Sequence, residues 1–221
     1  QVPTPMVPET HPYLALSEAG QAKFINEWAL YLKNLGRLDA AARCYEAQIA
    51  IRMRQESFGN AAQGNINLSW VWLQSGRLDL AMKRAGMALR LAEQADDAEG
   101  RRNSYASQGA ALGLRGAGYL ALEDFRRCLH WQRQAETNVS ERPLWSGRGI
   151  EHTLLLTRLG RHEEAQQLTK ANKDVLRGFN PTSYSIPKCN LILADLAICP
   201  GNLQTAQNWY EKSHNWAIVR D

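Results

Sequence analysis

The chain repeats one pattern of small and turn-forming residues five times along its length. Each repeat has a glycine in a short polar stretch, an alanine five residues later, and another small residue twelve positions before that alanine. The alanines follow at intervals of 40, 40, 44 and 41 residues, at Ala41, Ala81, Ala121, Ala165 and Ala206. The earlier small residues are Ala29, Ser69, Gly109, Thr153 and Ala194. Self-similarity at this period indicates stacked structural units that bury their apolar faces against one another.

The spacing within each repeat predicts two helices joined by a tight turn. Glycine adopts the left-handed turn conformation at low cost, and small residues allow two helix axes to approach closely. We expect larger apolar residues to fill the rest of the interface: Trp28, Leu32, Tyr45, Leu68, Trp72, Tyr105, Leu112 and Phe125. First helices are predicted over 21–35, 61–75, 102–115, 144–159 and 188–199. Second helices are predicted over 38–56, 78–95, 119–136, 162–177 and 202–217.

The first repeat resembles the tetratricopeptide repeat (TPR) in its order of aromatic, apolar and small residues, at Ile25, Trp28, Ala29, Leu32, Ala41 and Tyr45. The resemblance covers roughly residues 21 to 217 and implies an all-α fold, a right-handed α-α superhelix of about five TPR-like helical hairpins. The period near 40 exceeds the 34 residues of that family, so we expect longer second helices. Gly149 and His152 stand where large apolar residues are expected, and Gln48 replaces a small residue.

The repeats are expected to form a single domain over residues 21–221, preceded by a Pro-containing linker over residues 1–20 that belongs to a longer protein. The units are predicted over approximately 21–60, 61–101, 102–142, 143–186 and 187–221. The stretch Pro143–Gly149, with Leu159-Gly160-Arg161 after a Leu-rich helix, resembles the C-terminal repeats of bacterial STAND/NACHT-type signalling ATPases. That resemblance implies the sensor region of a larger signalling or defence protein.

Composition narrows the possible functions. The net charge of +4 is spread along the chain and does not indicate nucleic-acid binding. Apolar runs are far shorter than the roughly 20 residues of a membrane-spanning helix, and no secretion signal is present. The four scattered cysteines, Cys44, Cys128, Cys189 and Cys199, indicate reduced thiols rather than a zinc site, so we expect a cytoplasmic protein.

The chain also lacks the motifs of common enzymes. No phosphate-binding loop or dinucleotide fingerprint occurs, and no nucleophile, base and orienting group can be placed together. His162, Glu163 and Glu164 fall in the first turn of a predicted helix, where acids complement the helix dipole. The sequence therefore predicts neither an enzyme nor a site for a metal or cofactor.

A stack of hairpins can bind a partner along the wall formed by its first helices. Helical periodicity selects residues near each small residue, from three positions before it to five positions after it, that should face this wall. These are Asn26, Leu30, Lys33, Asn34, Asn67, Trp70, Gln74, Ser107, Glu151, Leu154, Arg158 and Asp195. Amide side chains pair with peptide backbone, and Lys33 and Arg158 suit carboxylates. The sequence predicts a groove for a protein or peptide; Trp70 either lines it or packs on a neighbouring first helix.

Self-association is an alternative prediction. The final predicted helix and the residues after it are rich in large apolar side chains: Trp209, Tyr210, Trp216, Ile218 and Val219. Helical-repeat proteins normally cover their ends with a polar capping helix. The pattern therefore predicts, as the alternative function, a self-association module that acts through the uncapped ends of the stack, with a homo-oligomer formed through the C-terminal helix.

Overall fold

The computed structural model describes residues 16–135, 144, 146–179, 183, 185–198 and 201–218, with side chains up to His214. These residues form ten α-helices and no strand: α1 (Glu18–Asn34), α2 (Leu38–Arg54), α3 (Phe58–Gln74), α4 (Leu78–Gln94), α5 (Ala98–Leu114), α6 (Gly118–Ala135), α7 (Ser146–Arg158), α8 (His162–Phe179), α9 (Ser185–Ile198) and α10 (Leu203–Ile218). The chain divides into two compact units within α5, after Ala111. Unit 1 contains α1 to α4 and most of α5, and unit 2 contains α6 to α10.

All five predicted hairpin turns contain a glycine with a left-handed backbone, with φ between 72° and 82°, at Gly36, Gly76, Gly116, Gly160 and Gly201. The backbone N–H of Gly76 donates to Leu73 O at 3.1 Å, and the next N–H, of Arg77, donates to Trp72 O at 2.9 Å. These bonds satisfy the last carbonyl groups of α3 while the chain reverses. The turn prediction is confirmed.

The two small residues of each repeat are buried where its helices meet. Ala29, Ala41, Ser69 and Ala81 are fully buried. In the second hairpin the Ser69 hydroxyl donates to the backbone carbonyl of Ala81 at 2.8 Å, which ties α3 directly to α4. Only a small side chain leaves room for such close backbone approach.

Four of the five first helices begin three or four residues earlier than predicted, whereas α7 begins two residues later, at Ser146. α1 starts after Ser17, whose hydroxyl accepts a hydrogen bond from Gly20 N at 3.2 Å. α5 starts after Asp97, whose carboxylate accepts one from Gly100 N at 3.0 Å. α1 to α5 consequently have 17 residues each. The extra length of the repeat is shared by both helices in unit 1, which corrects the prediction that only second helices are longer.

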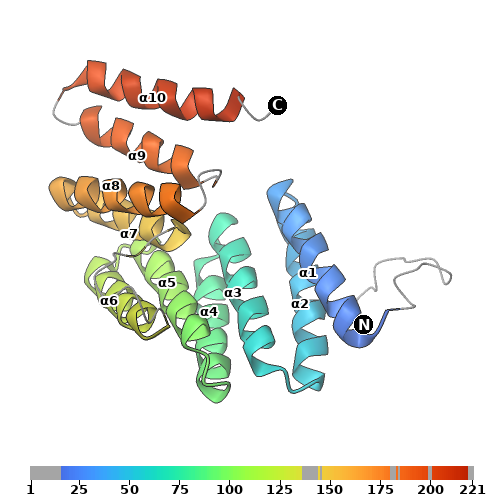
Figure 1. Cartoon of the computed structure of the whole chain (residues 1–221). Coiled ribbons are helices and arrows are strands. Elements are labelled where there is room, and N and C mark those ends of the chain that lie inside the picture. The colour runs from blue at the N-terminus through green and yellow to red at the C-terminus, as the bar shows by residue number, and fades with distance from the viewer. Residues whose placement is uncertain are drawn as a thin grey trace. The chain divides into compact units, whose positions relative to one another are not determined.

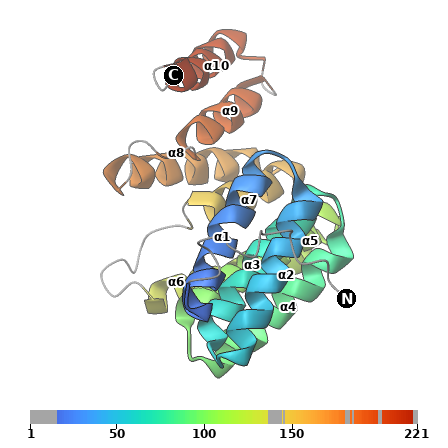
Figure 2. The same cartoon turned by 90° about the vertical axis from the view of Figure 1, so that its right-hand side faces the viewer.

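In unit 1, α3 packs against α2 and α4 and also contacts α1 and α5 directly (Figures 1 and 2). Its core contains Tyr45, Leu68 and Trp72, all buried as predicted. Trp28 is an exception, since 48% of its surface is exposed and it stacks on Tyr31 with ring centroids 5.5 Å apart. The equivalent residue 40 positions later, Leu68, is covered by the preceding hairpin. Among the described residues of unit 1, no helix precedes α1 to cover Trp28.

The departures from the repeat pattern are matched by changes on the neighbouring helix. Gln48 of α2 is buried, and Gly64 of α3 makes room for it: a Cβ added at Gly64 would lie 2.2 Å from Gln48 Oε1. In unit 2 a Cβ at Gly149 would lie 2.3 Å from Leu144 O and 2.6 Å from Asn172 Nδ2. A larger side chain at Gly64 would collide with the side chains of Gln48 and Ile49, and one at Gly149 would collide with the backbone carbonyl of Leu144 and the Asn172 amide.

Unit 2 stacks α7, α8, α9 and α10 in succession (Figure 1). Asn172 of α8 fixes the start of α7, because its side-chain oxygen accepts from Ser146 N at 2.7 Å and its amide donates to Ser146 O at 3.2 Å. His152 of α7 stacks on the buried ring of Phe125 in α6, with centroids 4.9 Å apart. The unexpected histidine thus serves as a flat core side chain.

Two glycines of the second hairpin are expected to respond in opposite directions to alanine. Gly76→Ala should lower the free energy of unfolding by about 1 kcal/mol, because an alanine in the left-handed region is strained although no atom lies within 4 Å. Gly86→Ala lies inside α4, where the new Cβ meets only Gln108 Nε2 at 3.8 Å. It should raise stability by about 0.5–1 kcal/mol. Urea unfolding of both variants measures the difference, and equal effects would contradict the turn assignment.

Candidate functional site: first-helix surfaces

A chain of hydrogen-bonded side chains crosses from α3 to α1 on the surface of unit 1. Gln63 Nε2 donates to Asn67 Oδ1 at 3.1 Å, and Asn67 Nδ2 donates to Asn26 Oδ1 at 3.3 Å. Asn26 Nδ2 in turn donates to Glu27 Oε1 at 3.3 Å. These bonds orient each amide while leaving it further donor and acceptor capacity. The arrangement suits a partner that presents backbone N–H and C=O groups.

Apolar side chains lie beside this polar chain. Leu30 of α1 is exposed, and Trp70 of α3 is half-buried against the core cluster that includes Ala110 and Ala111 of α5. Trp70 therefore packs against the core of unit 1 and also keeps part of its surface exposed. We call Asn26, Leu30, Lys33, Asn34, Asn67, Trp70 and Gln74 the amide surface; Lys33 is half-buried, and Asn34 and Gln74 are exposed.

Ser107 does not belong to this surface, contrary to the periodicity prediction. Its side chain is fully buried, and its hydroxyl lies 2.6 Å from the hydroxyl of Ser69. The two hydroxyls meet where α3 and α5 approach closely, and Ser69 also binds Ala81 O. Helical period alone does not distinguish a groove position from this close crossing, because both lie on the same side of the helix.

Unit 2 has its own surface on α7 and α9. Leu154 is half-buried and Arg158 exposed on α7, while Lys188, Leu191, Asp195 and Ile198 are exposed on α9. Burial raises the pKa of the half-buried Glu151, and the nearby charges of Arg158 and Lys188 lower it. The Tyr210 hydroxyl donates to Asp195 Oδ1 at 2.6 Å. These residues, with Glu151, form the charged surface.

Sequence reasoning missed Lys188 in the charged surface and Gln63 beside the amide surface. Each stands six residues before the small residue of its helix, Ala194 and Ser69 respectively. Six residues are nearly two helical turns, so this position shares the face of the predicted groove residues. A wider search along the same periodicity would have found both.

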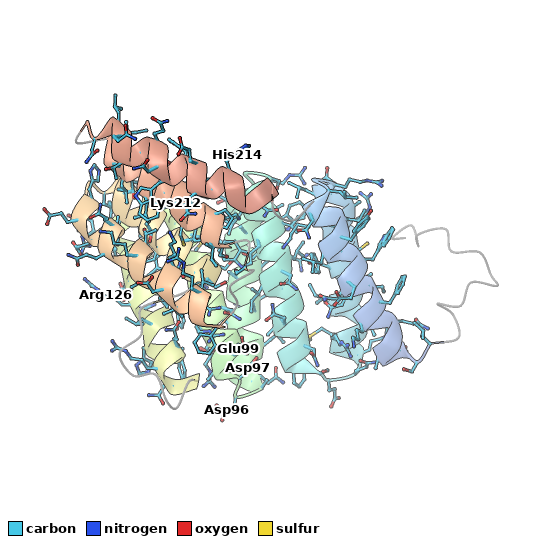
Figure 3. All side chains as sticks on the ribbon, turned by 45° about the horizontal axis from the view of Figure 1, so that its top comes forward. Asp96, Asp97, Glu99, Arg126, Lys212 and His214 are labelled. Carbon is cyan, nitrogen blue, oxygen red and sulfur yellow. The ribbon has the colours of Figure 1, made fainter. Side chains whose placement is uncertain are left out.

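Several arginines that stand close to another arginine in the sequence pair with carboxylates. Arg101 Nη2 lies 2.9 Å from Asp96 Oδ1, and Arg102 Nη2 lies 2.6 Å from Glu99 Oε1. Figure 3 shows Asp96, Asp97 and Glu99 together at the junction of α4 and α5. Arg127 likewise pairs with Glu123 and Asp124 of its own helix. These side chains stabilise helix ends and surfaces and do not form a basic stripe typical of nucleic-acid sites.

Trp209 of the C-terminal helix α10 makes cation–π contacts within unit 2. The ammonium groups of Lys173 and Lys212 lie 4.1 and 4.5 Å from the centre of the Trp209 ring. Burial lowers the pKa of Lys173 to about 8. Lys212 and His214 lie exposed along α10 (Figure 3). The side chains of Trp216 and Ile218, and all of Val219, lie outside the described residues, so the predicted C-terminal association stays a prediction.

The described residues contain no group of three or more His, Cys, Asp or Glu arranged to hold a metal. Cys128 and Cys189 are buried and Cys44 is half-buried, and none of these three forms a disulfide, whereas Cys199 lies outside the described part of the chain. Burial raises the pKa of Cys189 to about 11, which keeps it a neutral thiol near pH 7. Within the described ranges, no helix has both the length and the apolar character to cross a membrane.

Comparison with solved structures identifies the architecture. A Rap protein complexed with competence and sporulation factor matches with a TM-score of 0.75 and 14% identity, over 93% of this chain and 56% of that chain. TTC0263, a TPR protein of Thermus thermophilus, matches with a TM-score of 0.66 and 17% identity, over 90% and 93% of the two chains. The chain has the TPR fold.

A third TPR structure supports the same conclusion. The TPR-like repeats of a putative kinesin light chain from Podosopora anserina match with a TM-score of 0.60 and 18% identity, over 91% of this chain and 96% of that one. The present chain spans little more than half of the Rap structure. No protein-family model and no curated protein matches the sequence. At these identities the likeness establishes the TPR fold and not a shared ligand.

His152 should make folding depend on pH between about 6.5 and 4. Burial lowers its pKa from 6.5 to about 4 in the folded protein, whereas the unfolded chain binds the proton near 6.5. As pH falls through this window the unfolded state gains the proton first, so the free energy of unfolding decreases, by up to about 3 kcal/mol. Urea unfolding of wild type and His152→Phe, which preserves stacking on Phe125, measures the contribution of His152.

The comparison with His152→Phe is needed because Asp124 acts in the opposite direction. Burial raises the pKa of Asp124 to about 6, so its protonation favours the folded state as pH falls from about 6 to 3.8. Asp124 is present in both proteins and its effect cancels in the difference. Equal pH dependence of wild type and variant would show that His152 does not remain neutral in the fold.

Proposed function

We propose that the chain is a protein- or peptide-binding scaffold and that its partner binds to the first-helix surfaces. The observation that carries this proposal is the amide surface, where a hydrogen-bonded row of amides crosses α1 and α3 beside Leu30 and the half-exposed Trp70. Oriented amides with remaining hydrogen-bond capacity match an extended backbone, and a rigid indole provides an apolar anchor.

The chemistry of the amide surface favours an extended segment over a folded globular partner. Asn67 bonds to both Gln63 and Asn26, so its amide plane is held before any ligand arrives. A preorganised amide loses little conformational freedom on binding, which improves affinity. One structural neighbour with the same fold, the Rap protein, was solved with a bound factor.

Unit 2 offers a second surface of different chemistry. The charged surface alternates Glu151 and Asp195 with Arg158 and Lys188 and also presents Leu154 and Leu191. Mixed charges of this kind add specificity and faster association more than raw affinity. We propose that the charged surface of unit 2 binds charged side chains of a protein or peptide partner.

The binding proposal predicts that Asn67→Ala and Trp70→Ala weaken peptide binding. Peptides selected from a random phage-displayed library on the wild-type chain serve as probes, and isothermal titration measures their affinity for each variant. Loss of the Asn67 hydrogen bonds should weaken binding about 10-fold, and loss of the Trp70 indole about 30-fold.

Asn60→Ala is the matched control for this experiment. Asn60 lies in the first turn of the same helix, is exposed, and its amide donates only a local bond to Ser57 Oγ at 2.9 Å. The control should leave affinity unchanged. Circular dichroism melts verify that each variant folds, which is needed for Trp70 because it also packs on the core. Unchanged affinity in folded Asn67→Ala and Trp70→Ala proteins would rule out the amide surface.

We also propose that this scaffold is the sensor or interaction region of a larger bacterial signalling or defence protein that acts in the cytoplasm. The support is the sequence resemblance to STAND-type repeats at 143–149 and 159–161; Pro143 and Trp145 lie outside the described residues. The intact mass and upstream sequence of the native polypeptide test this. An upstream P-loop ATPase module is the expected result, and a native start near Gln1 would remove the sensor proposal.

A further inference from the structure

α1 carries a second apolar face that the binding surfaces do not use. Phe24, Trp28, Tyr31 and Leu35 are 46%, 48%, 53% and 55% exposed. Their spacing of four, three and four residues places them along one side of the helix. α1 lies at one end of the row of unit 1 helices (Figure 1). We call these four residues the α1 stripe.

The stripe differs from the corresponding face of α3, which is covered by α2. Forty residues after Phe24 stands Gly64, where an added Cβ would lie 2.2 Å from Gln48 Oε1 and 2.7 Å from Ile49 Cγ1 of α2. Gly64 therefore leaves room for the side chains of Gln48 and Ile49. Phe24 occupies the equivalent space on α1, so the stripe does not suit a preceding helix with the side chains of α2.

We propose that the α1 stripe is an interface with a second copy of this chain, in which two α1 helices pack antiparallel about a two-fold axis. A two-fold interface requires a patch that is complementary to itself. The spacing of the stripe is symmetric, so an axis between Trp28 and Tyr31 brings Trp28 opposite the partner's Tyr31. The same axis brings Phe24 opposite the partner's Leu35.

The area and charge of the stripe are consistent with a dimer core. Aromatic side chains bury about 150–250 Å² each, so the three aromatic residues and Leu35, each about half exposed, offer roughly 400 Å² per chain, or about 800 Å² in the pair. An interface of usual composition is about 60% apolar, which gives roughly 1,300 Å² in total, within the range of specific interfaces. The four residues of the stripe carry no charge, so pairing them across the axis brings no like charges together.

The α1 stripe shares no residue with the amide surface or the charged surface, so dimer formation does not depend on the proposed peptide binding. Trp28 and Tyr31 already stack within each chain at 5.5 Å, so the two rings would be ordered before association. Aromatic residues ordered at the centre of an interface are the usual carriers of its affinity. Trp28 is therefore the residue whose change should affect the dimer most.

Sedimentation velocity of the full 221-residue chain, from low micromolar to near-millimolar concentration, tests the dimer. The wild type should show a concentration-dependent dimer, and Trp28→Glu should raise its dissociation constant at least about 30-fold. Tyr119→Glu is the matched control, because Tyr119 is a 90% exposed aromatic residue on α6 outside the stripe. The control should leave the constant unchanged, and circular dichroism confirms folding of each variant.

A charge-pair experiment tests the register. Trp28→Lys and Tyr31→Glu should each be monomeric, whereas an equimolar mixture should dimerise, because the antiparallel arrangement places the lysine of one chain opposite the glutamate of the other. A mixture that stays monomeric overturns the antiparallel register. A wild type that is monomeric at every concentration overturns the proposal, and dimerisation only after deletion of residues 1–15 would assign the stripe to the N-terminal segment instead.

Discussion

Close approach between the two helices of each hairpin is the constraint on which the rest of the structure depends. A small residue of the first helix meets an alanine of the second, as Ser69 meets Ala81 with a hydroxyl-to-carbonyl distance of 2.8 Å. The glycine after each first helix reverses the chain without strain, so that the alanine five residues later reaches that crossing. The two helices are so close at this crossing that no larger side chain fits there. Changes in side-chain size elsewhere in a repeat must therefore be compensated by changes on neighbouring helices.

Such matching explains why the repeat can depart from its pattern and still pack. Gln48 enlarges the contact face of α2, and Gly64 on α3 removes a side chain at the same point. Gly149 similarly leaves space for the side chain of Asn172, which forms hydrogen bonds with the backbone N–H and C=O of Ser146. His152 stands where the repeat pattern predicts an apolar side chain. It stacks on Phe125, and it stays neutral near pH 7 because burial lowers its pKa to about 4. Interiors are close-packed, so volume lost on one helix is filled from the next.

The faces left exposed by this packing have separate chemistries. On α1, Asn26 and Leu30 belong to the amide surface, whereas Trp28 and Tyr31 belong to the α1 stripe, although these residues are close neighbours in sequence. The helical turn of about 100° per residue places the two sets on different sides. One helix thus presents both a polar surface suited to an extended backbone and an aromatic surface suited to a second chain.

The sequence by itself determined the number, order and approximate bounds of the helices, the five turns and the buried small residues, because each depends on local backbone preference and on a spacing that recurs. It also indicated most residues of the amide surface, since helical period depends only on position along the chain. Only the tertiary structure decided the environments of Ser107, Trp28 and Trp70. Ser107 is buried because α3 crosses α5 there, Trp28 is exposed because no described helix precedes α1, and Trp70 is shared between core and surface. Each outcome depends on a helix distant in sequence, and the period of one helix contains no information about how closely another approaches it.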